Sequence, residues 1–494
     1  MIREWIESNF EGISTSLVGL ISIALLGTLV GKALRYLLSF IIGAGIDAEA
    51  LGVFTFGLVL VRAGGMLSSI GLRTASQRLI ATNRTRGDSA GVVKTTILAV
   101  LMPFVLGLIV SSISYTLWPI ITSLLQIDMP QVIRVFLLGI PLFAVMDVGA
   151  SATRGFKTTR YYVYIREIGQ SGLAAFLVGF AVLTRLDFVT VIYAYLFSLL
   201  FGTGLSVYFL SKLTPDIRGS LADFPVRATL SVSIPLLVVA ASQYFVTWTD
   251  ILILGALRPP MDVGYYQAAF LYSSLVTVVL FGVNAIFPAL AADLYESGKI
   301  EYLETIYSVV TKWSVYIIGL LAVMLIFLSD ELLRLFGPDF LRARQSLKIL
   351  IAGQTIAAAT GPVSYLLTMT DFEKFESYNS VGLGVLNLLL NAILIPEFGI
   401  EGAAVATTVS LVLLNLVRLA QVKWLLGFSP YNRRYWKGGI ALIVATILIY
   451  LVSRLRLDIF HPVLIIAIGM LSFTLVLLFL GPDEEDRELL SLVS

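Results

Sequence analysis

The sequence contains no cysteine, one histidine and few charged residues, and each scarcity excludes a class of protein. Without cysteine there is no disulfide framework, no thiol nucleophile and no thiolate metal site. The histidine, His461, stands beside Pro462 in an apolar stretch, so a histidine metal cluster or a serine–histidine triad lacks its parts. Charged residues make up 13% of the 494 and hydrophobic residues 58%, whereas a soluble chain carries about 25% charged residues. A bilayer can accommodate this much apolar surface. The net charge of +2 indicates no nucleic-acid partner.

Apolar runs of membrane-spanning length recur along the whole chain. A helical span needs about 20 mostly apolar residues to cross about 30 Å of hydrocarbon. The runs lie near residues 17–42, 51–72, 93–114, 132–153, 163–184, 188–211, 228–256, 264–291, 310–328, 346–369, 378–395, 401–422, 438–454 and 461–480. They do not alternate with the period of two that a transmembrane β-barrel requires. We therefore expect an all-α integral membrane protein with about fourteen transmembrane helices.

Lysine and arginine gather in alternate loops and orient the predicted bundle. The loops 73–94, 154–166 and 423–437 are basic, whereas the turns 43–50 and 115–131 contain neither lysine nor arginine. Basic loops stay on the cytoplasmic side of a membrane. This bias predicts a multi-pass protein of the cell membrane with both termini in the cytoplasm, although the loops 329–345 and 454–460 also carry arginine and depart from it.

Glycines recur at a constant offset of 212 residues, which indicates an internal repeat. The pairs are Gly43 with Gly255, Gly52 with Gly264, Gly149 with Gly361, and Gly172 with Gly384. The predicted parts are two six-helix lobes, 1–212 and 213–426, two additional helices in 427–480, and an acidic cytoplasmic tail, 481–494, expected to be solvated and disordered. Because six is even, both lobes enter the membrane from the same side, as parallel repeats. Two such lobes are typical of alternating-access transporters, although duplicated bundles also serve as scaffolds or receptors.

Two stretches carry a resemblance to a known superfamily. Residues 37–71, with Leu-Gly-Val-Phe-Thr-Phe-Gly at 51–57, resemble the first hairpin of polysaccharide and oligosaccharide-lipid exporters, and residues 399–407 resemble their entry into helix 12. The resemblance covers nearly the whole chain, including the arrangement of twelve helices plus two. The superfamily includes flippases for lipid-linked saccharides, the peptidoglycan-precursor flippase, and multidrug and toxic-compound exporters. It implies two lobes that rock about a central cavity.

Three cationic side chains lie inside predicted spans, where an ionisable residue costs about 2.5–3.5 kcal/mol and is usually functional. Lys32 and Arg35 share one helix face, and Arg62 lies in the next helix. Arg35 and Arg62 are 12 and 15 residues from the turn near Asp47, so their depths agree within about 5 Å. Arginine binds phosphate oxygens bidentately and lysine adds a point charge. These residues, with Asp147 of the fourth helix, form the candidate substrate site. The peptidoglycan-precursor flippase similarly carries arginines in helices 1 and 2. In the alternative interpretation, Lys32 or Arg35 reaches the outer interface or pairs with Asp147.

A second set of polar residues lies at one depth in the predicted second lobe. Its members are Asp250 of helix 7, Asn387 and Asn391 one turn apart on helix 11, and Thr407 with the backbone carbonyl of Ala403 on helix 12. One carboxylate with neutral oxygens suits a monovalent hard cation. The set is similar to the sodium site of the peptidoglycan-precursor flippase, which has a second acid where this chain has Asn391. A proton on Asp250, or a plain hydrogen bond between Asp250 and Asn387, are the alternatives.

The sequence therefore predicts a flippase, not an enzyme, that moves a polyprenyl- or dolichyl-(di)phosphate-linked oligosaccharide to the outer leaflet for surface polysaccharide or glycan assembly. The expected partners are this lipid-linked oligosaccharide, membrane lipids and glycan-assembly enzymes, with sodium or a proton as coupling ion. The alternative is a cation-coupled multidrug antiporter of the same fold, which a cationic cavity disfavours. A membrane-embedded polymerase is disfavoured because the longest outer loop has only about 17 residues.

Overall fold

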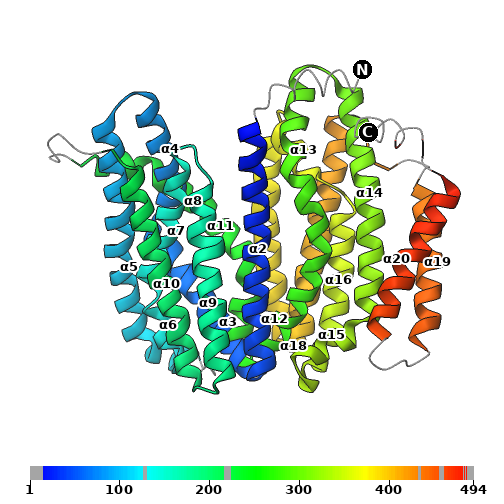
Figure 1. Cartoon of the computed structure of the whole chain (residues 1–494), viewed down its shortest axis with the longest axis horizontal. Helices are drawn as coiled ribbons and strands as arrows, with labels where there is room; N and C mark the ends of the chain where they lie inside the picture. The colour runs from blue at the N-terminus through cyan, green and yellow to red at the C-terminus, as the bar shows by residue number, and fades with distance from the viewer. Residues whose placement is uncertain are drawn as a thin grey trace. The chain divides into compact units, whose positions relative to one another are not determined.

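The computed structural model describes residues 15–125, 131–215, 224–431, 435–454 and 461–481, together with Asp483 and Asp486. Within these residues all regular secondary structure is helical (Figure 1). Eleven of the described helices are long and apolar enough to cross a membrane, or up to thirteen if each of two bent helix pairs counts as one span. The predicted class, an all-α integral membrane protein, is confirmed, and the number of spans is consistent with about fourteen.

The chain divides into two compact units, which we call the N-terminal unit (Ser8–Gln267) and the C-terminal unit (Ala268–Ser494). The helices that begin in the N-terminal unit are α2 (Thr15–Gly45), α3 (Ala48–Ser69), α4 (Leu72–Thr85), α5 (Ser89–Leu125), α6 (Ile133–Leu137), α7 (Ile140–Arg154), α8 (Arg160–Tyr162), η1 (Val163–Gln170), α9 (Ser171–Leu183), α10 (Phe188–Leu213), α11 (Val226–Leu257) and α12 (Pro260–Ser274). The C-terminal unit continues with η2 (Leu275–Thr277), α13 (Val278–Glu296), α14 (Ile300–Phe327), α15 (Ser329–Phe336), η3 (Pro338–Ala343), α16 (Arg344–Ala358), α17 (Val363–Met369), α18 (Glu373–Leu425), α19 (Trp436–Ser453) and α20 (His461–Leu480).

Every predicted apolar run falls on one or more of these helices. The α18 segment covers two predicted runs, and Gly399 interrupts it with non-helical dihedral angles, φ 56° and ψ −129°. The basic loop 73–94 is largely helical, because α4 occupies Leu72–Thr85. The repeat boundary at 212/213 stays a prediction, since the two compact units are defined by packing and not by descent.

Two glycines related by the 212-residue offset allow α3 and α12 to meet at backbone distance within the N-terminal unit. A Cβ atom at Gly52 would lie 1.8 Å from the carbonyl oxygen of Pro260, and one at Gly264 would lie 1.9 Å from that of Ala48. Ala48 and Pro260 are themselves 212 residues apart. The two contacts are therefore reciprocal, as they are across a two-fold axis.

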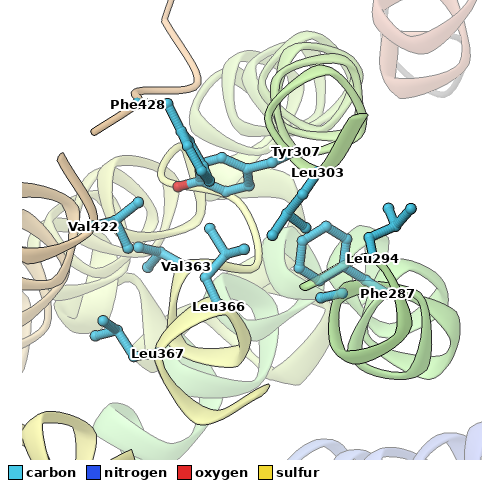
Figure 2. Packing of buried hydrophobic residues seen from close by; sticks show 10 residues of the cluster. Phe287, Leu294, Leu303, Tyr307, Val363, Leu366, Leu367, Val422 and Phe428 are labelled. Atoms are coloured by element: carbon cyan, nitrogen blue, oxygen red, sulfur yellow. The ribbon is translucent and has the colours of Figure 1, made fainter. Parts of the chain in front are cut away.

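Each unit has its own apolar clusters. In the N-terminal unit, α4, α5, α7 and α10 enclose Leu72, Ile80, Val92, Ala99, Val148, Ala152, Phe156 and Leu210. In the C-terminal unit, Figure 2 shows the side chains of Phe287, Leu303, Tyr307 and Phe428 gathered around those of Val363 and Leu366. The two additional helices, α19 and α20, pack on α14 through a separate cluster that includes Tyr316, Ala445 and Ile465.

The acidic tail is partly docked, which corrects the expectation of a solvated and disordered tail. Lys312 on α14 is 1% exposed, and its Nζ lies 2.8 Å from Asp486 and 3.1 Å from Asp483. Lys437 adds a second ion pair to Asp483 at 2.7 Å, and Trp313 Nε1 donates to Asp486. The physical reason is that a buried lysine needs counter-charges, and the first tail residues after α20 supply them. We call these residues the tail latch.

Burial disfavours the charged form of Asp483, but hydrogen bonds from Lys437 and Lys312 outweigh it and hold the pKa of this carboxyl below its usual value. The Asp483 carboxyl is therefore charged at neutral pH.

Candidate functional site

Helix α2 presses against η1 through two glycines one turn apart. A Cβ atom at Gly27 would lie 2.2 Å from a methyl carbon of Val163, and one at Gly31 would lie 2.1 Å from the carboxylate of Glu167. Small residues at this spacing let membrane helices approach closely. Arg35 is the next residue along the same helix face, so the close approach brings its guanidinium to Glu167.

The element that α2 contacts is a π-helix. Residues Val163–Gln170 form η1 between α8 and α9, and π-helical turns inside α-helices occur frequently at functional sites. Two adjacent ionisable residues of this helix, Arg166 and Glu167, form ion pairs with different partners. Glu167, 5% exposed, accepts a hydrogen bond of 2.8 Å from Arg35. Arg166 donates to Asp147 at 2.5 Å and to the hydroxyl of Tyr162 at 3.2 Å.

Asp147 on α7 is shared by two arginines. Besides its contact with Arg166, its second carboxylate oxygen lies 3.4 Å from Nε of Arg73. The ring of Tyr162 also contacts a third arginine, since the guanidinium carbon of Arg154 lies 3.5 Å from the ring centroid. This carboxylate is thus fully engaged as a counter-ion.

Arg62 on α3 has no counter-ion among the described residues. Among the described residues no carboxylate lies within ion-pair distance of it, and its buried Nε has no hydrogen-bond partner. Its guanidinium carbon lies 5.2 Å from the ring centroid of Trp248. Arg35 and Arg166 lie close enough to repel it electrostatically. We call Lys32, Arg35, Arg62, Asp147, Arg166 and Glu167 the cationic cluster; its four cations exceed its two carboxylates.

The structure places the predicted residues in one region but changes their pairing. Arg35 pairs with Glu167 and not with Asp147, so the alternative interpretation of an Arg35–Asp147 pair is wrong; Arg166 occupies that carboxylate instead. Lys32 lies near Arg35 and Glu167, close enough for their charges to interact.

Sequence reasoning missed Arg166 and Glu167. In the sequence, Arg166 belongs to the basic loop 154–166, and Glu167 lies within the apolar run 163–184. An acid inside a span was the available signal, because intramembrane acids are rare and usually paired.

The residues of the candidate cation site divide between the two units. In the N-terminal unit, Asp250 is 5% exposed. One of its carboxylate oxygens accepts a hydrogen bond of 2.6 Å from the hydroxyl of Tyr266, and the other accepts one of 2.8 Å from the backbone N–H of Ile251. A buried acid held in this way is a suitable acceptor for a proton or a cation.

In the C-terminal unit, Asn387 and Asn391 are hydrogen-bonded to each other. The amide nitrogen of Asn391 donates to the backbone oxygen of Asn387 at 2.8 Å and to its side-chain oxygen at 3.0 Å. The side-chain oxygen of Asn391 is buried without a partner, and Ala403 and Thr407 beyond the Gly399 break are also buried. A buried orphan carbonyl oxygen fits the ligand chemistry of a hard cation. The described residues contain no cluster of three or more histidine or acidic ligands for a metal.

The fold and the cationic cluster together define a polytopic membrane transporter with charged side chains inside one helical unit. The family model for "polysaccharide biosynthesis protein" matches residues 18–292, and the MatE model matches residues 235–393. The chain therefore belongs to the polysaccharide biosynthesis protein family, in the flippase branch of the superfamily that also holds the multidrug exporters.

Individual relatives agree with this placement. The chain is 26% identical over 305 residues to the "probable low-salt glycan biosynthesis flippase Agl15" of Haloferax volcanii, covering 59% of this chain and 62% of the relative. It thus spans about three-fifths of that relative's length. The lipid II flippase MurJ, in an inward closed conformation, superimposes with a TM-score of 0.69 at 15% identity, covering 92% of this chain and 97% of that one. An inward-facing multidrug transporter of the MATE family gives 0.62 at 19% identity, covering 80% and 94%. At these identities the two structures show a shared fold.

Proposed function

We propose that the protein flips a lipid-linked oligosaccharide, carried on a polyprenyl or dolichyl phosphate or diphosphate, across the cell membrane. The observation that carries the proposal is Arg62, an arginine inside the helical unit with no counter-ion among the described residues. An uncompensated guanidinium in this environment favours an anionic ligand, which it can hold bidentately. The names of two similar proteins, a probable glycan biosynthesis flippase and a lipid II flippase, support this substrate class.

The neighbouring ion pairs explain how the ligand is bound and released. Glu167 and Asp147 keep Arg35 and Arg166 in place while the site is empty, which lowers the repulsion that three arginines create together. An arriving phosphate first neutralises Arg62 and then competes with Glu167 for Arg35. Binding by exchange of counter-ions is reversible, and a flippase requires a headgroup that leaves at the other leaflet. Each step requires only contacts and no covalent change.

We propose cation coupling through Asp250, which either a proton or sodium neutralises. Its support is the burial of this carboxylate and its two hydrogen bonds. Translocation of the lipid-linked oligosaccharide that depends on an inward sodium gradient and not on a pH gradient would favour sodium as the coupling ion. Translocation that depends on a pH gradient and not on sodium would favour a proton. Glycan-assembly enzymes remain expected partners of such a flippase.

Binding of a short-chain polyprenyl-diphosphate disaccharide to the purified protein tests the substrate proposal. Arg62→Ala loses a charge-assisted contact worth about 1.5–3 kcal/mol, so the affinity falls by about 10- to 150-fold. Arg62→Lys keeps the charge but not the bidentate geometry and gives an intermediate loss. The matched control is Arg134→Ala, which removes an arginine stacked on Tyr115 in the same unit, outside the cationic cluster. Equal affinities for Arg62→Ala and Arg134→Ala would contradict the proposal.

The multidrug antiporter is the second candidate, favoured by the MatE match over residues 235–393. Organic cations require an acidic or aromatic site, whereas the cationic cluster carries an excess of positive charge. Export of cationic dyes that is unaffected by Arg62→Ala would favour the antiporter.

A further inference from the structure

A polar cavity of about 550 Å³ lies at one end of the N-terminal unit. It is formed where α4 ends, α5 begins and α10 ends, and it shares no lining residue with the cationic cluster. This end of the unit carries the basic residues of loop 73–94, which the charge bias assigns to the cytoplasmic side. Its volume lies within the range of about 300–1,000 Å³ that small-molecule sites occupy.

Two cations line this polar cavity, Arg84 and Lys212. The guanidinium carbon of Arg84 lies 5.4 Å from the ring centroid of Phe156, which belongs to the buried apolar cluster of this unit. Stacking on a fixed ring holds the arginine at the wall of the cavity. Among the described residues no carboxylate lies within ion-pair distance of either cation. Asp88, the acid nearest in sequence to Arg84, caps the N–H of Gly91 and does not line the cavity. Asp216, equally near to Lys212 in sequence, lies outside the described residues.

A second, apolar cavity of about 630 Å³ continues from the first. The two share Ser211, Thr214 and Pro215 in their linings. The second cavity runs between α5 and α10, and most of its remaining lining is Val, Ile and Leu. Leu101 and Val207 on its wall are 53% and 42% exposed, so the groove is open on an apolar flank of two membrane-spanning helices. A charged pocket thus leads directly into an apolar groove open to the bilayer.

We propose that these joined cavities bind one anionic membrane lipid, with its phosphate between Arg84 and Lys212 and a hydrocarbon chain in the groove between α5 and α10. Charge complementarity decides the occupant. A lipid chain gains little on moving from the bilayer into an apolar groove, because both environments are apolar. Selectivity therefore rests on the headgroup, and two cations without a counter-ion among the described residues favour a net negative headgroup over a zwitterionic one. The site is independent of the proposed flippase function.

The test measures retention of phosphatidylglycerol against phosphatidylcholine by the purified full-length protein, using native mass spectrometry with defined lipid additions. We expect the wild type to prefer phosphatidylglycerol. Each of Arg84→Gln and Lys212→Gln weakens its binding about fivefold, and the double variant about 25-fold. Leu101→Trp fills the groove without changing charge and also weakens binding. The matched control is Arg78→Gln, which removes an exposed charge from the same helix outside the cavity lining and changes binding less than twofold.

Two results with phosphatidylglycerol and phosphatidylcholine would overturn the proposal. One is a wild type that does not distinguish the two lipids. The other is an Arg84→Gln/Lys212→Gln variant that binds phosphatidylglycerol as tightly as Arg78→Gln does. If a polyprenyl-diphosphate saccharide binds in a manner dependent on Arg84 and Lys212 and phosphatidylglycerol does not, the site holds the lipid-linked saccharide and the proposal is also wrong. Matching unfolding temperatures establish that the variants are folded.

Discussion

Removing the two carboxylates of the tail latch leaves a charged lysine buried without a partner. Lys312 is 1% exposed, and its ion-pair partners Asp483 and Asp486 are 10% and 7% exposed. In the Asp483→Asn/Asp486→Asn variant the two side chains keep their size and their hydrogen-bonding oxygens but lose both charges. Lys312 lies in the middle of α14 and cannot turn to water without disturbing the helix.

The expected loss of stability follows from the buried lysine charge that remains without a counter-ion. Breaking a buried ion pair by removing one partner costs about 3–5 kcal/mol, because an uncompensated charge remains. At about 2–4 °C per kcal/mol for a unit of this size, the apparent unfolding temperature falls on the order of 10 °C. Lys312→Met alone costs less, because Asp483 keeps Lys437 and the tail can move its acids to water.

Thermal unfolding in detergent tests whether the tail latch stabilises the fold by compensating the charge of Lys312. Adding Lys312→Met to the Asp483→Asn/Asp486→Asn variant removes the stranded charge and restores most of the lost stability. The matched control is Asp330→Asn, which breaks an exposed ion pair with Arg344 in the same unit and costs at most about 1 kcal/mol. A triple variant less stable than the double variant would refute the reasoning.

Three further predictions concern the tail and two close helix contacts. The pKa of Asp483 is lowered in the fold, so the ion pairs of Asp483 stabilise the fold fully above the ordinary aspartate pKa of about 4. This stabilisation is lost as the pH falls below that value. The rate of tail proteolysis, measured as a function of pH, tests the prediction. Gly31→Ala places a methyl group 2.1 Å from the Glu167 carboxylate, so it costs about 1–3 kcal/mol and weakens substrate binding. Gly52→Ala meets the backbone oxygen of Pro260 at 1.8 Å and lowers the unfolding temperature further, because backbone cannot move aside as a side chain can.

Glycines in open surroundings provide the controls for these two substitutions. A Cβ atom at Gly204 or at Gly382 would meet nothing within 4 Å, and both residues lie inside helices. Replacing glycine by alanine inside a helix then stabilises by about 0.5–1 kcal/mol. If Gly31→Ala or Gly52→Ala behaves like Gly204→Ala, the close contacts are not packed as described. Proteolysis of the tail that is independent of pH between 3 and 7 would contradict the pH argument.

The spans were predictable because hydrocarbon solvation acts on the average of about 20 residues and tolerates local errors. Counting at about 1.5 Å per residue along a helix also predicted similar depths for Arg35 and Arg62, and this stays a prediction. In the structure the two side chains lie close enough for their charges to interact.

The partners of these arginines could not be predicted in the same way. A π-helix changes the angular position of every residue after it, so a regular helical period misplaces Arg166 and Glu167. The docking of the tail could not be predicted for a related reason: an acidic run is ordinarily solvated, and only the burial of Lys312 shows that Asp483 and Asp486 have a partner. A lysine inside a predicted span was the signal to look for such a partner.

Leaflet translocation of a fluorescent polyprenyl-diphosphate oligosaccharide in proteoliposomes tests the central claim most directly. We predict that the wild type moves the lipid, that Arg62→Ala reduces the initial rate at least tenfold, and that Arg134→Ala moves it at the wild-type rate. Translocation by Arg62→Ala at the wild-type rate, with equal amounts of folded protein, would contradict the account of the cationic cluster as the headgroup site.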